Sequence, residues 1–126
     1  MTPTSPFPNL QNQQFMNLTT YRKSGVPVTT PVWFAQVGDK VYVYTQANSG
    51  KVKRVRNNGK VEVGPCTRSG KPLGPTETAA ARLMSLDEGK FVDNLLTKKY
   101  GLLKRIISFV AKLRGSTPAY LEIRPA

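Results

Sequence analysis

The chain has 126 residues, of which 39% are hydrophobic, and 19 Lys and Arg against 7 Asp and Glu give it a formal net charge of +12. It has no histidine and a single cysteine, Cys66, which argues against Ser-His-Asp and Cys-His catalysis, an internal disulfide and the usual protein metal sites. The positive charge calls for an anionic partner, which can be nucleic acid, an acidic membrane or a phosphorylated small molecule.

The first eight residues contain three prolines and have neither the basic start nor the hydrophobic segment of a secretory signal. We therefore expect residues 1–8 to be a disordered leader and residues 9–126 to form a single domain in the cytoplasm. No apolar run approaches the length that crosses a bilayer, so we expect no membrane partner. The lone Cys66 is expected to be a small core residue.

Turn residues divide much of the chain into short β-branched and aromatic runs. Such runs with short turns predict a mainly β fold, a barrel or sandwich, with flanking helices. The predicted strands cover residues 16–22, 26–36, 40–45, 60–67, 76–85 and 119–124.

The second predicted strand contains Pro27 and Pro31, which cannot donate hydrogen bonds to a neighbouring strand. The strand must therefore lie at an edge or be locally broken. Some backbone groups around residues 29–33 would then need another partner, and a flat heterocycle with its own donors and acceptors would supply one. Trp33 can line such a site, although a lone tryptophan more often anchors a core.

A short cationic helix is predicted directly after the third strand. Asn48 or Ser49 can cap its start, and Asn58 with Gly59 can end it. The free amides at the start of a helix favour an anion, so this segment is a plausible phosphate site; a solvated basic helix is the alternative. Its cationic residues are Lys51, Lys53, Arg54 and Arg56.

Two more helices are predicted near the carboxyl end. Asp87 and Glu88 start the first, which runs to about Tyr100, and residues 102–113 form the second. Apolar residues recur at helical spacing along the second helix, with basic residues opposite. Such a stripe most often covers a sheet, while a membrane surface and subunit pairing remain alternatives.

Several segments together form a pattern typical of one family. They are residues 17–25 (NLTTYRKSG), 30–34 (TPVWF), 44–45, 49–57 (SGKVKRVRN), 64–66, 74–75, 100–102, 113–115 and 121–125. This pattern resembles the pyridoxamine 5'-phosphate oxidase-like flavin-binding split β-barrel superfamily, and within it the class of probable deazaflavin (F420)-dependent oxidoreductases. The resemblance covers nearly everything after the leader.

The resemblance implies a six-stranded antiparallel split β-barrel with a short phosphate-binding helix and two carboxyl-terminal helices. It also implies a homodimer that binds FMN or coenzyme F420 at the subunit interface and transfers hydride to or from an unknown small organic substrate. The implied cofactor contacts are Ser49, Lys51 and Lys53 or Arg54 at the phosphate, Thr30, Pro31, Val32 and Trp33 at the ring, and Thr45 at the ribityl chain. Arg22, Lys23 and Arg56 are candidates for the longer anionic tail of F420.

Two other functions are compatible with the residues. A small basic barrel can bind nucleic acid, although the tyrosines alternate with valines as core residues do. A catalytically silent cofactor or haem store is the other alternative, but without histidine a haem iron would need a weaker ligand. No side chain stands out as a catalytic acid or base, and no metal site is expected.

Overall fold

The computed structural model describes residues 7–11, 13–115 and 117–126, so most of the expected leader lies outside the described residues. Of that leader, Phe7 packs in the core and Pro8 begins a 3-10 helix. The elements are η1 (Pro8–Leu10), β1 (Phe15–Tyr21), β2 (Pro27–Val32), β3 (Phe34–Val37), β4 (Lys40–Gln46), α1 (Gly50–Asn57), β5 (Lys60–Cys66), β6 (Glu77–Leu83), α2 (Leu86–Tyr100), α3 (Leu102–Leu113) and β7 (Pro118–Pro125).

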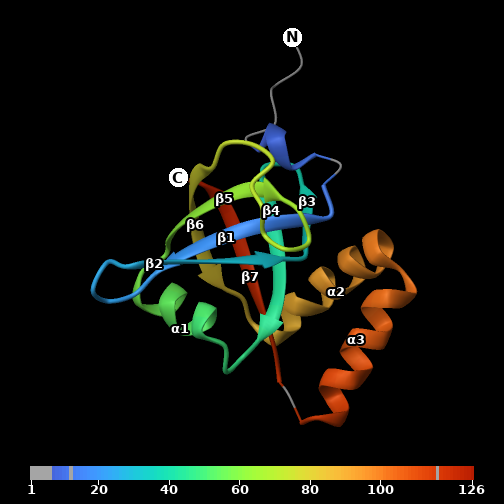
Figure 1. The fold of residues 1–126 in the computed structure, drawn as a ribbon. Coiled ribbons are helices and arrows are strands. Elements are labelled where there is room, and N and C mark those ends of the chain that lie inside the picture. The colour runs from blue at the N-terminus through green and yellow to red at the C-terminus, as the bar shows by residue number, and fades with distance from the viewer. Residues whose placement is uncertain (1–6, 12, 116) are drawn as a thin grey trace.

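All seven strands belong to one curled antiparallel sheet in the order β2-β1-β5-β6-β7-β4-β3 (Figure 1). The sheet is a half-barrel, so the expected six-stranded barrel was wrong in strand number and in closure. The reason is the proline-containing strand, which is interrupted at Trp33 and becomes β2 and β3 at opposite edges of the sheet. The predicted edge position or break is confirmed, and both occur.

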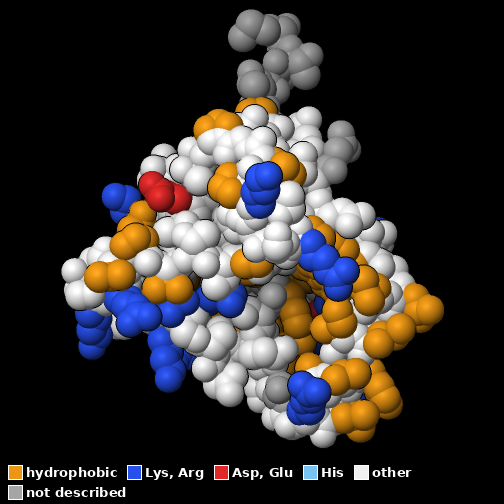
Figure 2. Space-filling view, in the orientation of Figure 1, with side chains coloured by type: hydrophobic (Ala, Val, Ile, Leu, Met, Phe, Trp, Pro, Cys, Tyr) orange, Lys and Arg blue, Asp and Glu red, His pale blue; other side chains and the backbone are white. Residues whose placement is uncertain are grey.

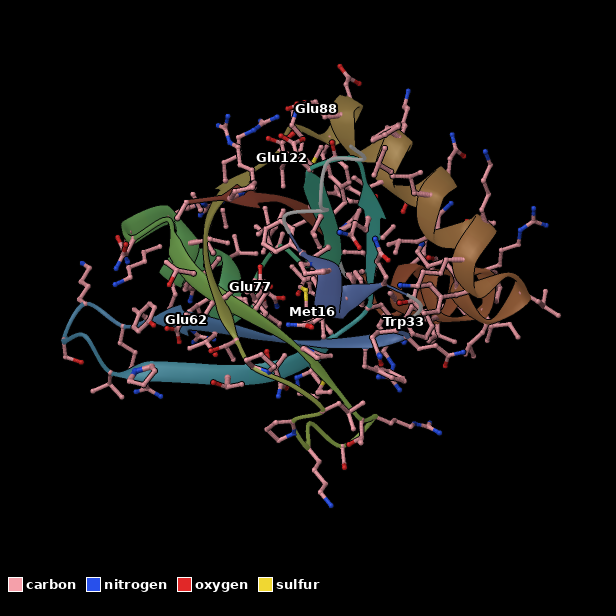
Figure 3. All side chains as sticks on the ribbon, turned by 90° about the horizontal axis from the view of Figure 1, so that it is seen from above. Met16, Trp33, Glu62, Glu77, Glu88 and Glu122 are labelled. Carbon is pink, nitrogen blue, oxygen red and sulfur yellow. The ribbon has the colours of Figure 1, made fainter. Side chains whose placement is uncertain are left out.

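The inner face of the curl holds the main hydrophobic core. Cross-strand partners such as Met16 and Val32, or Val43 and Leu121, point to the same face and are buried together. Figure 3 shows Met16 in this interior and Trp33 at the end of the sheet that meets α2 and α3. Cys66 is a buried free thiol, as expected, and burial raises the pKa of this thiol.

Helix α2 packs on the sheet through a second core that includes Val92, Leu96 and Tyr120. The helix begins with a capping box, in which Ser85 Oγ accepts from the Glu88 amide and the Glu88 carboxylate accepts from the Ser85 amide. This cap confirms the predicted start of the helix, which then packs against Tyr120 of β7.

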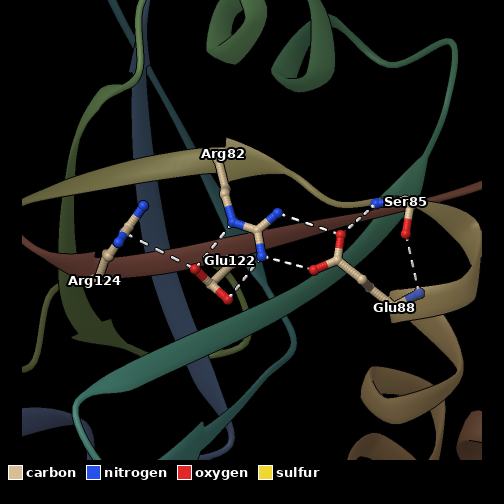
Figure 4. Close-up of polar contacts among 5 residues, drawn as sticks. All are labelled: Arg82, Ser85, Glu88, Glu122 and Arg124. Atoms are coloured by element: carbon tan, nitrogen blue, oxygen red, sulfur yellow. Dashed lines mark hydrogen bonds and ion pairs between the residues drawn. The ribbon is translucent and has the colours of Figure 1, made fainter.

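Arg82 on β6 joins the sheet to α2. Its guanidinium contacts Glu122 on β7 at 3.1 Å and Glu88 on α2 at 2.7 Å (Figure 4). Hydrogen bonds from Arg82 and from the Ser85 backbone lower the pKa of Glu88 to about 2, and Arg82 also lowers the pKa of Glu122.

Acid is therefore expected to destabilise the fold by protonating Glu88. Because its pKa is about 2 in the folded chain against an ordinary 4.5, the contribution is complete above that ordinary value and is lost as the pH falls towards 2. Urea unfolding at about pH 7 and about pH 3 measures the decrease in the free energy of unfolding, which should be smaller for Glu88→Gln than for the wild type. Glu77→Gln on β6 is the control, and its free energy of unfolding should decrease as much as that of the wild type. Equal decreases for the wild type and Glu88→Gln would contradict the assignment.

Helix α3 presents its apolar side to solvent, which corrects the expectation that this side covers the sheet. Seven apolar residues are exposed, from 39% at Ile107 to 71% at Leu113, whereas the buried residue is Lys104. Lys104 Nζ lies 3.2 Å from Asp93 Oδ1 and 4.5 Å from the Tyr44 ring centroid. The side of α3 that carries Lys104 and its hydrogen-bond partner Ser108 therefore faces the protein. None of the described helices is long and apolar enough to cross a membrane.

Candidate functional site

Three segments far apart in the sequence meet around a hollow of about 260 Å³ between α1 and α3. Figure 2 shows this side of the molecule, with Lys and Arg gathered over α1 and β2, hydrophobic side chains gathered over α3, and a recess between them. The hollow is lined by Pro31, Val32 and Trp33 at the end of β2, Tyr44, Thr45 and Gln46 at the end of β4, Lys51 on α1 and Ile107 on α3.

Most of the residues predicted to contact a cofactor lie at or beside this hollow. Five of them line it, namely Pro31, Val32, Trp33, Thr45 and Lys51.

Five predicted contacts remain, and one of them, Thr30, does not line the hollow and is described below with the buried polar atoms. Ser49 is adjacent to the hollow, since Thr45 Oγ1 donates to Ser49 Oγ at 3.4 Å. Arg54 contacts β1 close to the start of α1. Lys53 is exposed, and Arg56 lines a different hollow together with Met84 and Pro118, so neither shares this site.

The start of α1 concentrates positive charge. Ser49 is its N-cap, as predicted, but the Ser49 side chain makes no capping hydrogen bond. Arg54 Nε donates to Thr20 Oγ1 at 2.6 Å, and a Cβ on Gly50 would lie 2.5 Å from Arg54 Nη1, so the guanidinium folds over the first turn. Burial and then the charge of Arg54 lower the pKa of Lys51. Among the described residues no carboxylate forms an ion pair with Lys51 or Arg54.

Two buried polar atoms near this site have no hydrogen-bond partner within the described chain. They are Thr30 Oγ1 and Gln46 Oε1. Gln46 lines the hollow, and Thr30 pairs with Leu18, which places it on the inner face of the sheet with the Arg54-bound Thr20. Leaving such an atom unpaired costs about 1–3 kcal/mol. Lys51 and Arg54 can donate to an anionic group, and Gln46 Oε1 can accept from a polar atom, so the site fits a ligand that carries both.

Trp33 sits at the break between β2 and β3 and is held there by Tyr100, the last residue of α2. Their rings stack with centroids 4.4 Å apart and planes 8° apart. The Phe34 amide donates to the Tyr100 hydroxyl at 3.1 Å, and that hydroxyl lies 2.6 Å from the Gln14 carbonyl to which it donates. Burial raises the pKa of Tyr100 to about 12, so the hydroxyl stays protonated at neutral pH. Tyr100 thus provides a partner for the backbone at the break.

Removing the Tyr100 hydroxyl is expected to loosen Trp33. In Tyr100→Phe the stack can remain, but the Phe34 amide loses its acceptor and the Gln14 carbonyl its donor. We expect the free energy of unfolding to fall by about 1–2 kcal/mol. Urea unfolding followed by tryptophan fluorescence reports on this position directly, because Trp33 is the only tryptophan. Unchanged stability together with an unchanged Trp33 spectrum would contradict this role.

Sequence reasoning missed several residues of the site. Tyr44 lies in the strand predicted at residues 40–45 and Gln46 directly follows it, and the sequence could not place the end of this strand against the helices. Tyr100 and Ile107 come from the last two helices, and a helical pattern does not show which strand a helix end will contact. The one available signal was an aromatic residue at the end of the first of these helices, just before Gly101.

Comparison with known proteins identifies the family of this chain. The family model for Pyridoxamine 5'-phosphate oxidase matches residues 8–89, more than half of the chain. The chain belongs to the pyridoxamine 5'-phosphate oxidase family. The resemblance expected from the sequence motifs is thereby confirmed. A search of curated proteins returned no match.

Solved structures share the fold of this family member at low identity. The heme storage protein HutZ from Vibrio cholerae has a TM-score of 0.72 at 16% identity, covering 92% of this chain and 84% of its own. An F420 Reductase has a TM-score of 0.62 at 16% identity, covering 99% and 96%. A Putative Pyridoxamine 5'-phosphate oxidase from Listeria innocua has a TM-score of 0.60 at 20% identity, covering 92% and 86%. At these identities the likeness shows the fold alone.

Proposed function

We propose that this family member binds a flavin or deazaflavin coenzyme, FMN or F420, and is an oxidoreductase acting on a small organic substrate. One observation carries the proposal: a hollow lined by Pro31, Val32 and Trp33 also receives Lys51 from the first turn of α1. A ring and a phosphate are the two parts that FMN and F420 share. The recess therefore has an apolar wall that suits the ring and, in the same hollow, a cationic residue that suits the phosphate.

The proposed contacts follow from this arrangement. Lys51, Arg54 and the backbone amides at the start of α1 hold the phosphate, with Ser49 beside them. The segment from Thr30 to Trp33 lies along the ring, and Thr45 lies near the ribityl chain. When bound, the ring supplies hydride transfer, and the chain supplies binding, orientation and electrostatics.

F420 is favoured over FMN by the additional cations beyond the recess. The anionic tail of F420 extends past its phosphate, whereas FMN ends there. Arg22 and Lys23 directly follow β1 and are exposed, and Lys53 is exposed on α1. Figure 2 shows Lys and Arg side chains gathered over β2 and α1. We propose that the tail follows this surface. Arg56 lines a separate hollow and is the weakest of the predicted tail contacts.

Titration calorimetry with FMN and with F420 tests this function. We expect both to bind, F420 more tightly, and the advantage of F420 to shrink as salt is raised because its extra contacts are exposed charges. Failure of both cofactors to bind would overturn the proposal. Equal affinity for both at every salt concentration would remove the preference for F420.

We also propose a homodimer with the cofactor at the subunit interface. The support is the exposed apolar side of α3, which includes Ile106, Phe109 and Leu113 and adjoins the recess through Ile107. Contiguous apolar surface of this kind usually marks an interface. Sedimentation should give a dimer for the wild type and a monomer for Phe109→Ser with Leu113→Ser. A wild-type monomer at micromolar concentration would contradict the dimer.

The haem-store alternative has a structural neighbour, but that likeness concerns the fold alone. The chain has no histidine, and Cys66 is buried in the sheet away from the recess lining. No described feature therefore favours a haem ligand over a flavin-type cofactor.

A further inference from the structure

A second hollow of about 370 Å³ lies next to the proposed cofactor site. Trp33 and Ile107 line both hollows, so these two side chains form the border that the hollows share. A molecule in the second hollow would therefore be a direct neighbour of whatever occupies the first. Nothing in the cofactor assignment uses this second space.

The walls of the second hollow are mostly aromatic and aliphatic. The stacked rings of Trp33 and Tyr100 form one side, and Phe15, Leu103 and Ile107 complete the apolar lining. Tyr100 is held by hydrogen bonds with the Phe34 amide and the Gln14 carbonyl, so the aromatic wall is preorganised. Flat rigid walls of this kind favour a planar apolar molecule.

One full charge, that of Arg68, lines this apolar space. Arg68 belongs to the turn between Thr67 and Lys71, which is closed by the Gly70 amide to the Thr67 carbonyl at 2.9 Å and the Thr67 amide to the Lys71 carbonyl at 2.9 Å. Asn17 Nδ2 donates to the Gly70 carbonyl at 2.8 Å and ties the turn to β1.

The same turn approaches the ring segment. An added Cβ at Gly70 would lie 3.7 Å from Pro31 Cδ, so this turn borders the proposed cofactor site. In the part of the chain that is described, no carboxylate pairs with Arg68. The exposed Arg68 side chain thus lines an apolar hollow from an anchored turn, with its charge available to a ligand.

We infer that the second hollow is the substrate pocket of the proposed oxidoreductase and that it takes a planar aromatic carboxylate. The aromatic part lies against Trp33 and Tyr100, and the carboxylate accepts hydrogen bonds from Arg68. Calling this ligand a substrate rests on the proposed function, but its binding can be measured without any reaction.

Calorimetry with 2-naphthoate and its uncharged analogue 2-naphthylmethanol tests the pocket. The wild-type protein, saturated with F420 or FMN, should bind the carboxylate about five- to tenfold more tightly than the alcohol. Arg68→Gln should abolish this preference and leave the affinity for the alcohol unchanged. Lys71→Gln, which removes the same charge from the same turn, is the control and should keep the preference.

The outcomes separate the two proposals. Equal preference in the wild type and Arg68→Gln would overturn the substrate pocket while cofactor binding still supported the proposed function. So would 2-naphthoate that binds the cofactor-free protein but not the cofactor-saturated protein, because the two ligands would then share one site. An Arg68-dependent preference in protein that binds neither FMN nor F420 would support the pocket chemistry and overturn its assignment to an oxidoreductase.

Discussion

Replacing Lys51 by alanine is expected to weaken the binding of F420 and FMN by about 10- to 100-fold. Lys51 lines the recess, and a charge-assisted hydrogen bond to a phosphate contributes about 1.5–3 kcal/mol. Loss of the side chain also leaves Arg54, whose guanidinium lies near Gly50, as the remaining cation close to the recess. Titration calorimetry of each cofactor into wild type and variant measures the change.

Lys53→Ala is the matched control because it removes the same group from the same helix. Lys53 is exposed and does not line the recess, so Lys53→Ala should weaken cofactor binding less than Lys51→Ala does. The weakening in Lys53→Ala should be larger for F420 than for FMN. Urea unfolding should show that both variants remain folded. Unchanged affinity in Lys51→Ala, or an equal loss in the two variants, would contradict the phosphate assignment.

Replacing Gly89 by alanine is expected to give the largest loss of stability. A Cβ at this buried position of α2 would lie 2.2 Å from two atoms of the Tyr120 ring. That ring cannot easily move, because its hydroxyl donates to Asp93 Oδ2 at 2.7 Å and its side chain is packed in the second core. Overpacking of this kind costs about 1–3 kcal/mol and sometimes more.

Whether Gly89→Ala raises or lowers the free energy of unfolding shows whether α2 packs closely on Tyr120. In an unhindered helix the same change would stabilise by about 0.5–1 kcal/mol, since glycine is the poorer helix former. Asn94→Ala, at an exposed position of α2, is the control and should leave stability nearly unchanged or raise it slightly. An increase in the free energy of unfolding of Gly89→Ala would show that the helix is not seated on Tyr120.

Much of the fold follows from local patterns in the sequence. The alternating β-branched runs located the strands, and Asp87 with Glu88 marked the start of α2. Pro27 and Pro31 correctly indicated an edge or a break, yet the sequence did not reveal that one run would supply both edges of the sheet. That outcome depends on long-range pairing of β3 with β4, which no local pattern encodes.

The site was predictable where its residues lie in motifs and unpredictable where they depend on packing. Lys51, Thr45 and Pro31 come together as expected. The orientation of α3 was not expected, because amphipathic periodicity gives the apolar side of a helix but not what that side contacts. Here Lys104 lies inward and pairs with Asp93, while the apolar side of α3 is exposed.

Determining the structure of the chain with F420 or FMN bound is the most direct test of the central claim. The account predicts that the phosphate lies at the start of α1 within hydrogen-bonding distance of Lys51, with the ring along Pro31 to Trp33. A cofactor bound with its phosphate away from α1, or seated in another part of the molecule, would contradict it.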